Sequence, residues 1–257
     1  MSDWDPAQYL VFAQPRLRPA LELLMHVQLA APALVYDLGC GTGALTRIMA
    51  ERWPSASIIG VDDSTDMLSH APEATPNLRW LRQDIATWTP ASAPDLIYSN
   101  AALHWLPDHQ GLFRRLIGAL APGGVLAVQM PRNFSAPSHV AIAETVRAGP
   151  WRARLEPMLR ESPVAEPRWY LDLLGTLCPE GDLWQTEYFQ VLSGENPVKE
   201  WTKGTWLKPL LAALPGSERA GFEEAYARRV AQAYPRRADG TTVLPFLRLF
   251  FIARRAP

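Results

Sequence analysis

The sequence predicts an α/β fold built around a parallel β-sheet, and two observations carry this prediction. Between residues 33 and 130, short β-branched or apolar runs alternate with stretches of helical period, which is the pattern of successive βαβ units. A glycine-rich turn follows the first of these runs and leads directly into a helix. Because crossovers between parallel strands are right-handed, the carboxyl ends of the strands, and any ligand bound there, are expected at one edge of the sheet.

The individual elements follow from the same patterns. Strands are predicted at 33–37, 57–62, 78–81, 95–99 and 125–130, and later in the chain at 182–192 and 249–253. Helical periods at 45–52 and 112–120 lie between the early strands, the first stopped by Pro54 and the second by the turn at 122–124. A helix is also predicted over 217–234, from apolar positions that begin at Phe222, with Ser217 as its N-cap.

Composition excludes several classes of partner. The chain has 25 Lys and Arg against 26 Asp and Glu, a net charge of -1, so it has no global field to attract nucleic acid or an anionic membrane. Cys40 and Cys178 are far apart and show no metal-ligand spacing, so we expect no metal site and a reducing, cytoplasmic setting. We also expect neither secretion nor membrane insertion, and the sequence leaves the oligomeric state open.

The glycine-rich turn spans 37–43 (DLGCGTG) and is a candidate ligand cradle. Gly39, Gly41 and Gly43 permit positive φ and let a ligand approach the backbone. With Ala44, the first two also match the dinucleotide pattern, which keeps an NAD-dependent dehydrogenase as an alternative. Asp37 argues against it, because a pyrophosphate about 4 Å from this carboxylate would be repelled by about 4 kcal/mol. The ammonium group of S-adenosylmethionine would instead be attracted.

Further polar residues follow the next strands. Asp62 closes the second strand, where a carboxylate can accept hydrogen bonds from both hydroxyls of a ribose. Asp84 follows the third strand and could accept from an adenine amine, and Asn100 closes the fourth. Any one of these acids alone would more often be a helix N-cap or a solvated turn residue. Their order along one sheet edge predicts ammonium, ribose and base recognition, and hence S-adenosylmethionine as the cofactor.

The segments DLGCGTG, GVDDSTDML, QDI and the PGG turn before VLAVQM resemble the class I S-adenosylmethionine-dependent methyltransferases. The resemblance implies a Rossmann-like, seven-stranded, mostly parallel sheet whose last strand is antiparallel. It also implies S-adenosyl-L-homocysteine as the product formed from the cofactor. Asp63 stands where the family often has an apolar residue, so we expect Met67 or Ile85 to pack against the adenine, and Asp63 remains a cofactor-binding candidate.

The resemblance extends over one domain, 1–257, for which we expect four parts. These are an N-terminal helical lid (1–32), a cofactor-binding core (33–130), a helical cap insertion rich in Pro, Arg and Trp (131–181), and late strands and helices (182–257). In the lid, Tyr9 and Arg18 are candidates for covering the cofactor, with Arg18 near its methionine carboxylate. An ordinary amphipathic helix packed on the sheet is the equally plausible alternative.

Segments such as WDPAQY, NAALHWLPDH and EWTKGT resemble members of this family that esterify a small polycarboxylic acid. A carboxylate is already ionised at pH 7, so no general base is expected and alignment of the reactants suffices. A polycarboxylate requires cationic and hydrogen-bonding partners. The candidates are His104, Trp105, Arg132, Asn133, Trp151, Arg152 and Lys203. For each of them the alternative is a structural role, as a surface charge or a packing residue. Besides the dehydrogenase, a non-catalytic cofactor-binding module serving a partner subunit remains an alternative.

Overall fold

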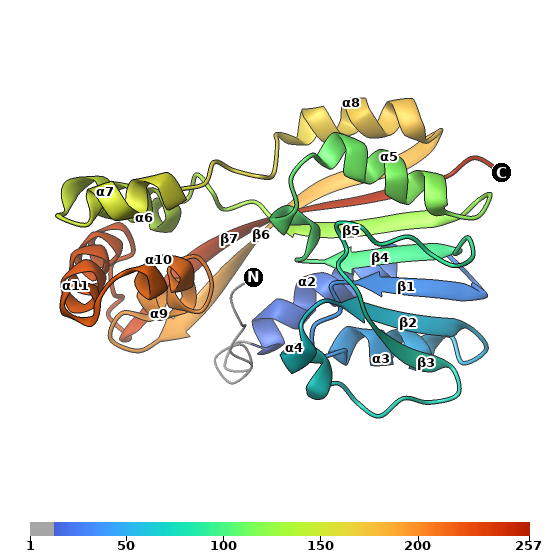
Figure 1. The fold of residues 1–257 in the computed structure, drawn as a ribbon, viewed down its shortest axis with the longest axis horizontal. Helices are drawn as coiled ribbons and strands as arrows, with labels where there is room; N and C mark the ends of the chain where they lie inside the picture. The colour runs from blue at the N-terminus through green and yellow to red at the C-terminus, as the bar shows by residue number, and fades with distance from the viewer. Residues whose placement is uncertain (1–12) are drawn as a thin grey trace. The chain divides into compact units, whose positions relative to one another are not determined.

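The computed structural model describes residues 13–257, which form two compact units (Figure 1). The first, which we call the sheet unit, comprises 13–131, 163–186 and 248–257 of the described residues. The second, the helical unit, comprises 132–162 and 187–247. The two long late strands run from one unit into the other.

A seven-stranded sheet has the order β3-β2-β1-β4-β5-β7-β6. Its strands are β1 (Leu34–Leu38), β2 (Ser57–Asp62), β3 (Leu78–Arg82), β4 (Leu96–Asn100), β5 (Val125–Pro131), β6 (Glu180–Ser193) and β7 (Thr241–Arg254). Strands β1 to β5 pair in parallel, and β7 pairs antiparallel with β5, from Val125 opposite Arg254 to Pro131 opposite Arg248. The predicted fold class, including the antiparallel last strand, is confirmed.

Each predicted strand is present, and β7 begins earlier than expected, at Thr241. The residues of β7 that precede Arg248 lie beyond the last pair with β5. Pro245 therefore removes no hydrogen bond to β5, and the strand continues through it.

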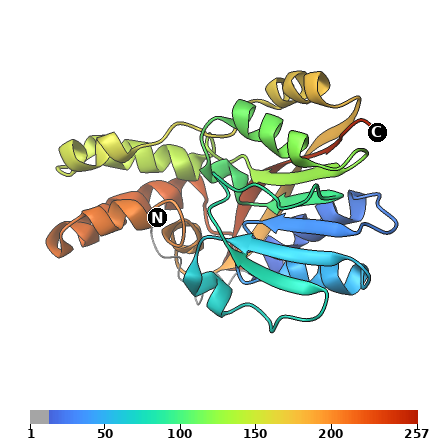
Figure 2. The same ribbon diagram turned by 45° about the vertical axis from the view of Figure 1, so that its right-hand side comes forward.

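Helices cover both faces of the sheet within the sheet unit (Figure 1 and Figure 2). On one side lie α5 and α8, and on the other α2 and α3. The bounds are α2 (Ala13–His26), α3 (Ala44–Arg52), α4 (Thr65–Ser69), η1 (Leu103–Trp105), α5 (His109–Ala119) and α8 (Pro167–Leu177). The helical periods predicted at 45–52 and 112–120 correspond to α3 and α5. The expected lid segment thus includes a helix packed on the sheet, where the buried Tyr98 hydroxyl of β4 donates to the Ala20 carbonyl at 2.5 Å.

A loop takes the place of a helix between β3 and β4. Arg115 on α5 donates to the carbonyls of Ile85, Ala86 and Trp88, which ties this loop to the helix. The Trp88 ring is buried and meets Tyr36 edge-on at a centroid distance of 4.9 Å. These contacts fix the backbone that follows Asp84 at the carboxyl edge of the sheet.

The helical unit contains α6 (Pro137–Ala148), α7 (Arg152–Leu155), η2 (Glu156–Met158), α9 (Pro197–Lys203), α10 (Lys208–Ala213) and α11 (Gly216–Ala233). The helix predicted at 217–234 is α11, but the prediction of Ser217 as its N-cap is wrong. The helix begins at Gly216, and the extended Pro215 is the N-cap residue without a side-chain cap. The Pro215 carbonyl accepts from the amides of Glu218 and Arg219, so Ser217 lies inside the first turn.

The expected cap insertion is divided between the two units. Residues 132–162 lie in the helical unit, whereas α8 lies in the sheet unit, where Tyr170 packs against Phe113 of α5. The four-part, single-domain organisation expected from the sequence stays a prediction. No helix among the described residues is long and apolar enough to cross a membrane.

Candidate functional site

The glycine turn after β1 needs glycine at each of its three positions because of φ, and at two of them a Cβ would also clash. Gly39, Gly41 and Gly43 have φ of 75°, 57° and 71°, in the left-handed region that favours glycine. A Cβ on Gly39 would lie 2.1 Å from the Cβ of Ala102, and one on Gly43 would lie 2.2 Å from the Trp80 ring. A Cβ on Gly41 would meet no described atom within 4 Å. Gly41 is therefore the position of this turn where backbone is open to a ligand.

Strand β2 holds this turn in place. The amides of Gly39 and Cys40 donate to the Val61 carbonyl at 2.8 and 3.0 Å. The Gly41 amide donates to Oδ2 of Asp62 at 2.9 Å, and the Ser64 amide donates to Oδ1 of the same carboxylate at 3.0 Å. Two backbone donors thus orient Asp62, which is half-buried. Each carboxylate oxygen retains acceptor capacity for a further hydroxyl group.

Asp37 is a buried carboxyl at the end of β1. Its side chain is 2% exposed, and its Oδ2 accepts a hydrogen bond from the Thr46 hydroxyl on α3 at 2.7 Å. Burial raises the pKa of Asp37 to about 7, the Thr46 hydrogen bond opposes this rise, and the charge of Asp62 adds to it. At neutral pH this carboxyl is therefore close to half ionised, and a cation beside it would favour the charged form.

The acids after β2 and β3 lie close to one another. Burial raises the pKa of Asp63, and the charges of Asp62 and Asp84 raise it further. Asp84 is exposed, and its Oδ1 accepts from the Ala86 amide at 2.8 Å. The structure thus brings the strand-end acids together as one negative region. Near it, Met67 on α4 is buried and Ile85 is half-buried.

The end of β4 and the segment that follows it carry buried polar atoms. Asn100 Oδ1 and His104 Nδ1 are buried and have no hydrogen-bond partner among the described residues. Burial, together with the charges of Arg248 and His109, lowers the pKa of His104 to about 3, so its ring is neutral at pH 7. Trp105 is half-buried beside it, with ring centroids 4.6 Å apart. Of the predicted acceptor residues, His104 and Trp105 belong to the sheet unit.

The remaining acceptor candidates belong to the helical unit. Arg132 is half-buried directly after β5. The Asn133 amide exchanges two hydrogen bonds with the backbone of Leu247, at 2.7 and 3.0 Å. Trp151 is buried against Phe222 and donates to the Thr145 carbonyl at 2.8 Å. Asn133 and Trp151 thus have packing and hydrogen-bonding partners inside their own unit.

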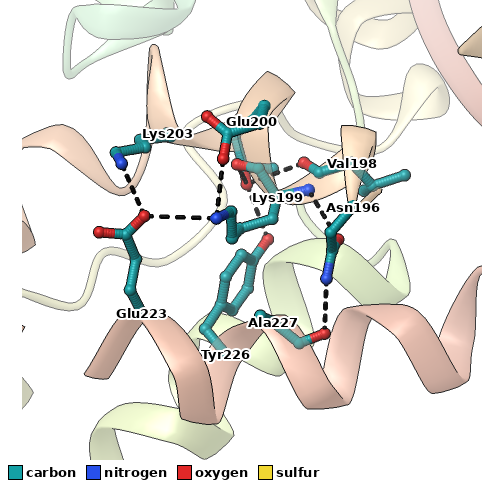
Figure 3. Close-up of polar contacts among 9 residues, drawn as sticks. Asn196, Val198, Lys199, Glu200, Lys203, Glu223, Tyr226 and Ala227 are labelled. Atoms are coloured by element: carbon teal, nitrogen blue, oxygen red, sulfur yellow. Dashed lines mark hydrogen bonds and ion pairs between the residues drawn. The ribbon is translucent and has the colours of Figure 1, made fainter. Parts of the chain in front are cut away.

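Two cationic candidates already form ion pairs. Arg152 on α7 is exposed and lies 2.8 Å from Glu156, the first residue of η2. Lys203 on α9 lies 2.6 Å from Glu223 on α11, and Glu223 also meets Lys199 at 3.5 Å (Figure 3). Lys203 is therefore paired with Glu223, whereas Lys199 is paired with Glu200 at 2.7 Å as well as with Glu223, which links the two helices.

One of the two lid candidates lies among the described residues. Arg18 lies exposed on α2, and Tyr9 lies outside the described residues.

Two buried polar residues of the same sheet edge were missed by the sequence interpretation. Arg248 on β7 is 5% exposed, and its Nη1 donates to Oε1 of the fully buried Gln129 on β5 at 3.0 Å. The available signal was a polar residue inside each of two apolar runs, VLAVQM and LPFLRLF. Such a residue is unusual in a strand buried on both faces.

A parallel sheet with an antiparallel strand beside β5, an open glycine turn after β1 and acids at or near the ends of three successive strands define a class I methyltransferase. Residues 35–124 match a family model described as a methyltransferase domain. A trans-aconitate 2-methyltransferase from Azoarcus sp. BH72 is 46% identical over 99% of this chain and all of its own length. One from Methylobacterium radiotolerans is 47% identical over the full length of both chains. The chain therefore belongs to the trans-aconitate 2-methyltransferase family of class I methyltransferases.

A solved structure shows the same fold. The phosphoethanolamine N-methyltransferase 2 of Haemonchus contortus, in complex with phosphomonomethylethanolamine and S-adenosylhomocysteine, aligns with a TM-score of 0.56 at 16% identity. The alignment covers 93% of this chain and 53% of that one. At this identity the likeness supports the fold alone.

The raised pKa of Asp37 predicts how stability depends on pH. Between about pH 4 and pH 7 the unfolded chain loses this proton while the folded chain keeps it, so the Asp37 contribution to stability falls as pH rises. We expect the free energy of unfolding of Asp37→Asn at pH 8 to exceed that of the parent by up to about 4 kcal/mol. This difference in the free energy of unfolding should become smaller toward pH 4.

The control has the opposite sign. Hydrogen bonds from Thr241 hold the pKa of Asp239 below its ordinary value, so Asp239→Asn should lose stability relative to the parent as pH rises. Denaturant melts of all three proteins at pH 4 to 8 measure both effects. A gap between Asp37→Asn and the parent that does not change with pH contradicts the assignment.

Proposed function

We propose that the chain transfers the methyl group of S-adenosylmethionine to one carboxylate of trans-aconitate, giving the monomethyl ester and S-adenosylhomocysteine. The observation that carries the proposal is the relationship of 46% and 47% identity, over essentially the full length, to trans-aconitate 2-methyltransferases. The strand-end acids and the open glycine turn are the features of this chain that fit such a cofactor.

The residues of the sheet unit suit a cationic nucleoside ligand. Asp37 offers a buried carboxyl that a positive ammonium would ionise, and Gly41 offers backbone without a Cβ. Asp62 has both oxygens oriented for the two hydroxyls of a ribose. We assign adenine recognition to Asp84, with packing from Met67 or Ile85 and with Asp63 beside them. A pyrophosphate would meet this negative region unfavourably, which argues against the dehydrogenase alternative.

The proposed reaction requires no general base from the protein. When bound, the sulfonium of the cofactor supplies an activated methyl group. The acceptor carboxylate is ionised at pH 7 and is itself the nucleophile, so the chain has to align it and exclude water. His104 is neutral at this pH and therefore offers hydrogen bonding without charge, and Trp105 offers an apolar wall. Arg132, which follows β5 directly, stays a predicted acceptor cation.

Other expected acceptor residues are better explained by structure. Asn133 and Trp151 bond backbone groups of their own unit, and Arg152 and Lys203 are matched by acids. A role in acceptor binding for these four stays a prediction. The reducing, cytoplasmic setting inferred from the two cysteines also stays a prediction.

The direct test of the proposed function is turnover. Purified full-length protein, incubated with methyl-labelled S-adenosylmethionine and trans-aconitate, should form a labelled monomethyl ester, which mass spectrometry identifies. Turnover of a different acid but not of trans-aconitate would reject the substrate and retain the class. Binding of NAD without binding of S-adenosylhomocysteine in calorimetry would reject the class, and a lack of turnover on any acceptor would support a non-catalytic module.

Two variants separate cofactor binding from acceptor binding. Asp62→Ala removes a carboxylate that accepts charge-assisted hydrogen bonds, so S-adenosylhomocysteine should bind about 10- to 100-fold more weakly while the acceptor KM stays constant. Arg132→Ala should raise the acceptor KM about 10-fold and leave cofactor affinity constant. Arg154→Ala, which removes an exposed ion pair with Glu218, is the control and should change neither value. An Asp62→Ala protein with parental cofactor affinity would contradict the assignment.

A further inference from the structure

The indole ring of Trp80 lies on the face of the sheet that α3 covers. Trp80 on β3 pairs in register with Gly60 on β2, and Gly60 pairs with Asp37 on β1, so the three residues form one row across the strands. Side chains in such a row point to the same face of the sheet. That face is the one of α3, because Thr46 of α3 donates to the Asp37 carboxyl. The glycine in the middle of the row leaves space for the neighbouring ring.

The ring fills the space that two glycines leave. A Cβ on Gly60 would lie 2.5 Å from the Trp80 ring, and one on Gly43 would lie 2.2 Å from the same ring. The Cβ on Gly60 would also lie 3.0 Å from the Sγ atom of Cys40, so this thiol of the glycine turn reaches the same space. Trp80 therefore packs directly against the backbone of β2 and of the glycine turn, which only glycine at both positions permits.

A hydrogen bond fixes the orientation of the ring. Trp80 Nε1 donates to the Pro72 carbonyl at 2.8 Å, in the segment that follows α4. Trp80 is half-buried, and an indole N–H that leaves water normally keeps such a partner. The ring cannot turn away from Gly43 without breaking this bond. Trp80 is therefore a fixed support for the glycine turn.

The two halves of the glycine turn are held by different means. Glycine has more backbone conformations to lose on folding than any other residue, so a turn with three glycines depends on contacts from outside. Strand β2 supplies hydrogen bonds to the amides of Gly39, Cys40 and Gly41. At Gly43, where α3 begins without a side-chain cap, the Trp80 ring supplies the packing contact.

We propose that Trp80 is a positioning residue for the cofactor: its ring holds the glycine turn at Gly43 and thereby keeps Gly41 open to S-adenosylmethionine. The proposal rests on the cofactor of the proposed function and is independent of the acceptor. Trp80 acts through the backbone of the turn and has no need to touch the ligand. A turn that spends less time in the binding conformation binds its ligand more weakly in the same proportion.

The test measures the affinity for S-adenosylhomocysteine by calorimetry. Trp80→Leu removes the ring, so the dissociation constant should rise about 10-fold because the turn then samples other conformations. The KM for trans-aconitate at saturating S-adenosylmethionine should stay constant, since the turn serves the cofactor.

Trp53→Leu is the matched control for loss of a packed indole. Trp53 is buried at the opposite end of α3, and its Nε1 donates to the Leu29 carbonyl at 3.2 Å. This variant should lose stability, as Trp80→Leu does, but it should retain the parental affinity for S-adenosylhomocysteine. An equal loss of affinity in both variants would show that Trp80 acts on stability alone, and would overturn the proposal.

A second substitution tests whether the effect passes through the ring. In the parent, the methyl group of Gly60→Ala would lie 2.5 Å from the Trp80 ring and must displace it, so S-adenosylhomocysteine should bind about 10-fold more weakly. In Trp80→Leu the ring is gone, so adding Gly60→Ala should weaken binding by less than about 2-fold. Equal losses in the two backgrounds would contradict the proposal.

The outcomes distinguish the role of Trp80 from the proposed function. Parental S-adenosylhomocysteine affinity in folded Trp80→Leu overturns the role of Trp80, even if the parent methylates trans-aconitate. If the parent binds S-adenosylhomocysteine in a Trp80-dependent manner but shows no turnover, the proposed function fails alone. Absence of binding to the parent overturns both. If Trp80→Leu does not fold, Trp80→Phe takes its place, because its shorter side chain forms no hydrogen bond to Pro72, and parental affinity in that variant overturns the role equally.

Discussion

The burial of the Asp37 carboxyl at the end of β1 is the constraint on which the rest of the site depends. A carboxyl in this position is costly to ionise, and Thr46 is the described hydroxyl that offsets part of this cost. The chain turns sharply directly after β1 through glycines with left-handed φ. At the first of them, Gly39, Ala102 leaves no room for a Cβ. Asp62 then fixes the Gly41 amide. A cationic ligand would complete this arrangement by ionising Asp37.

The near-zero net charge of the chain hides a division of charge at one edge of the sheet. Acids lie at or near the ends of β1, β2 and β3, where the cofactor is proposed, whereas a buried guanidinium lies on β7 beside β5. The antiparallel insertion of β7 beside β5 produces this division, because it brings a residue from the end of the chain next to the last parallel strand. His104 is neutral at pH 7, so it can form hydrogen bonds without adding charge to either region.

Much of the fold could be predicted from the sequence because local patterns decide it. The β-branched runs, the periods of α3 and α5 and the glycine turn are all signals within a few residues. Ser217 was misassigned as a cap because the extended Pro215 supplies the carbonyl that starts α11. Pro215 directly follows Leu214, the C-cap residue of α10, so the start of α11 depends on where α10 ends.

The candidate site was predicted less completely, because pairing across the chain decides it. The ion pair of Lys203 with Glu223 joins two helices that α10 separates in the chain, so the charge of Lys203 looked available when only the sequence was considered. Arg248 and Gln129 were read as parts of apolar strands. Their alignment follows from the register of β5 with β7, which links residues 119 positions apart.

The most direct measurement of the central claim is the pKa of Asp37 itself, from carboxyl ¹³C NMR titrations without and with S-adenosylhomocysteine, with the resonance assigned by Asp37→Asn. We predict a pKa near 7 in the free protein, which falls below about 5 when the ammonium of the ligand binds beside it. A pKa near 4 in the free protein, or a value near 7 that the ligand does not change, would contradict it.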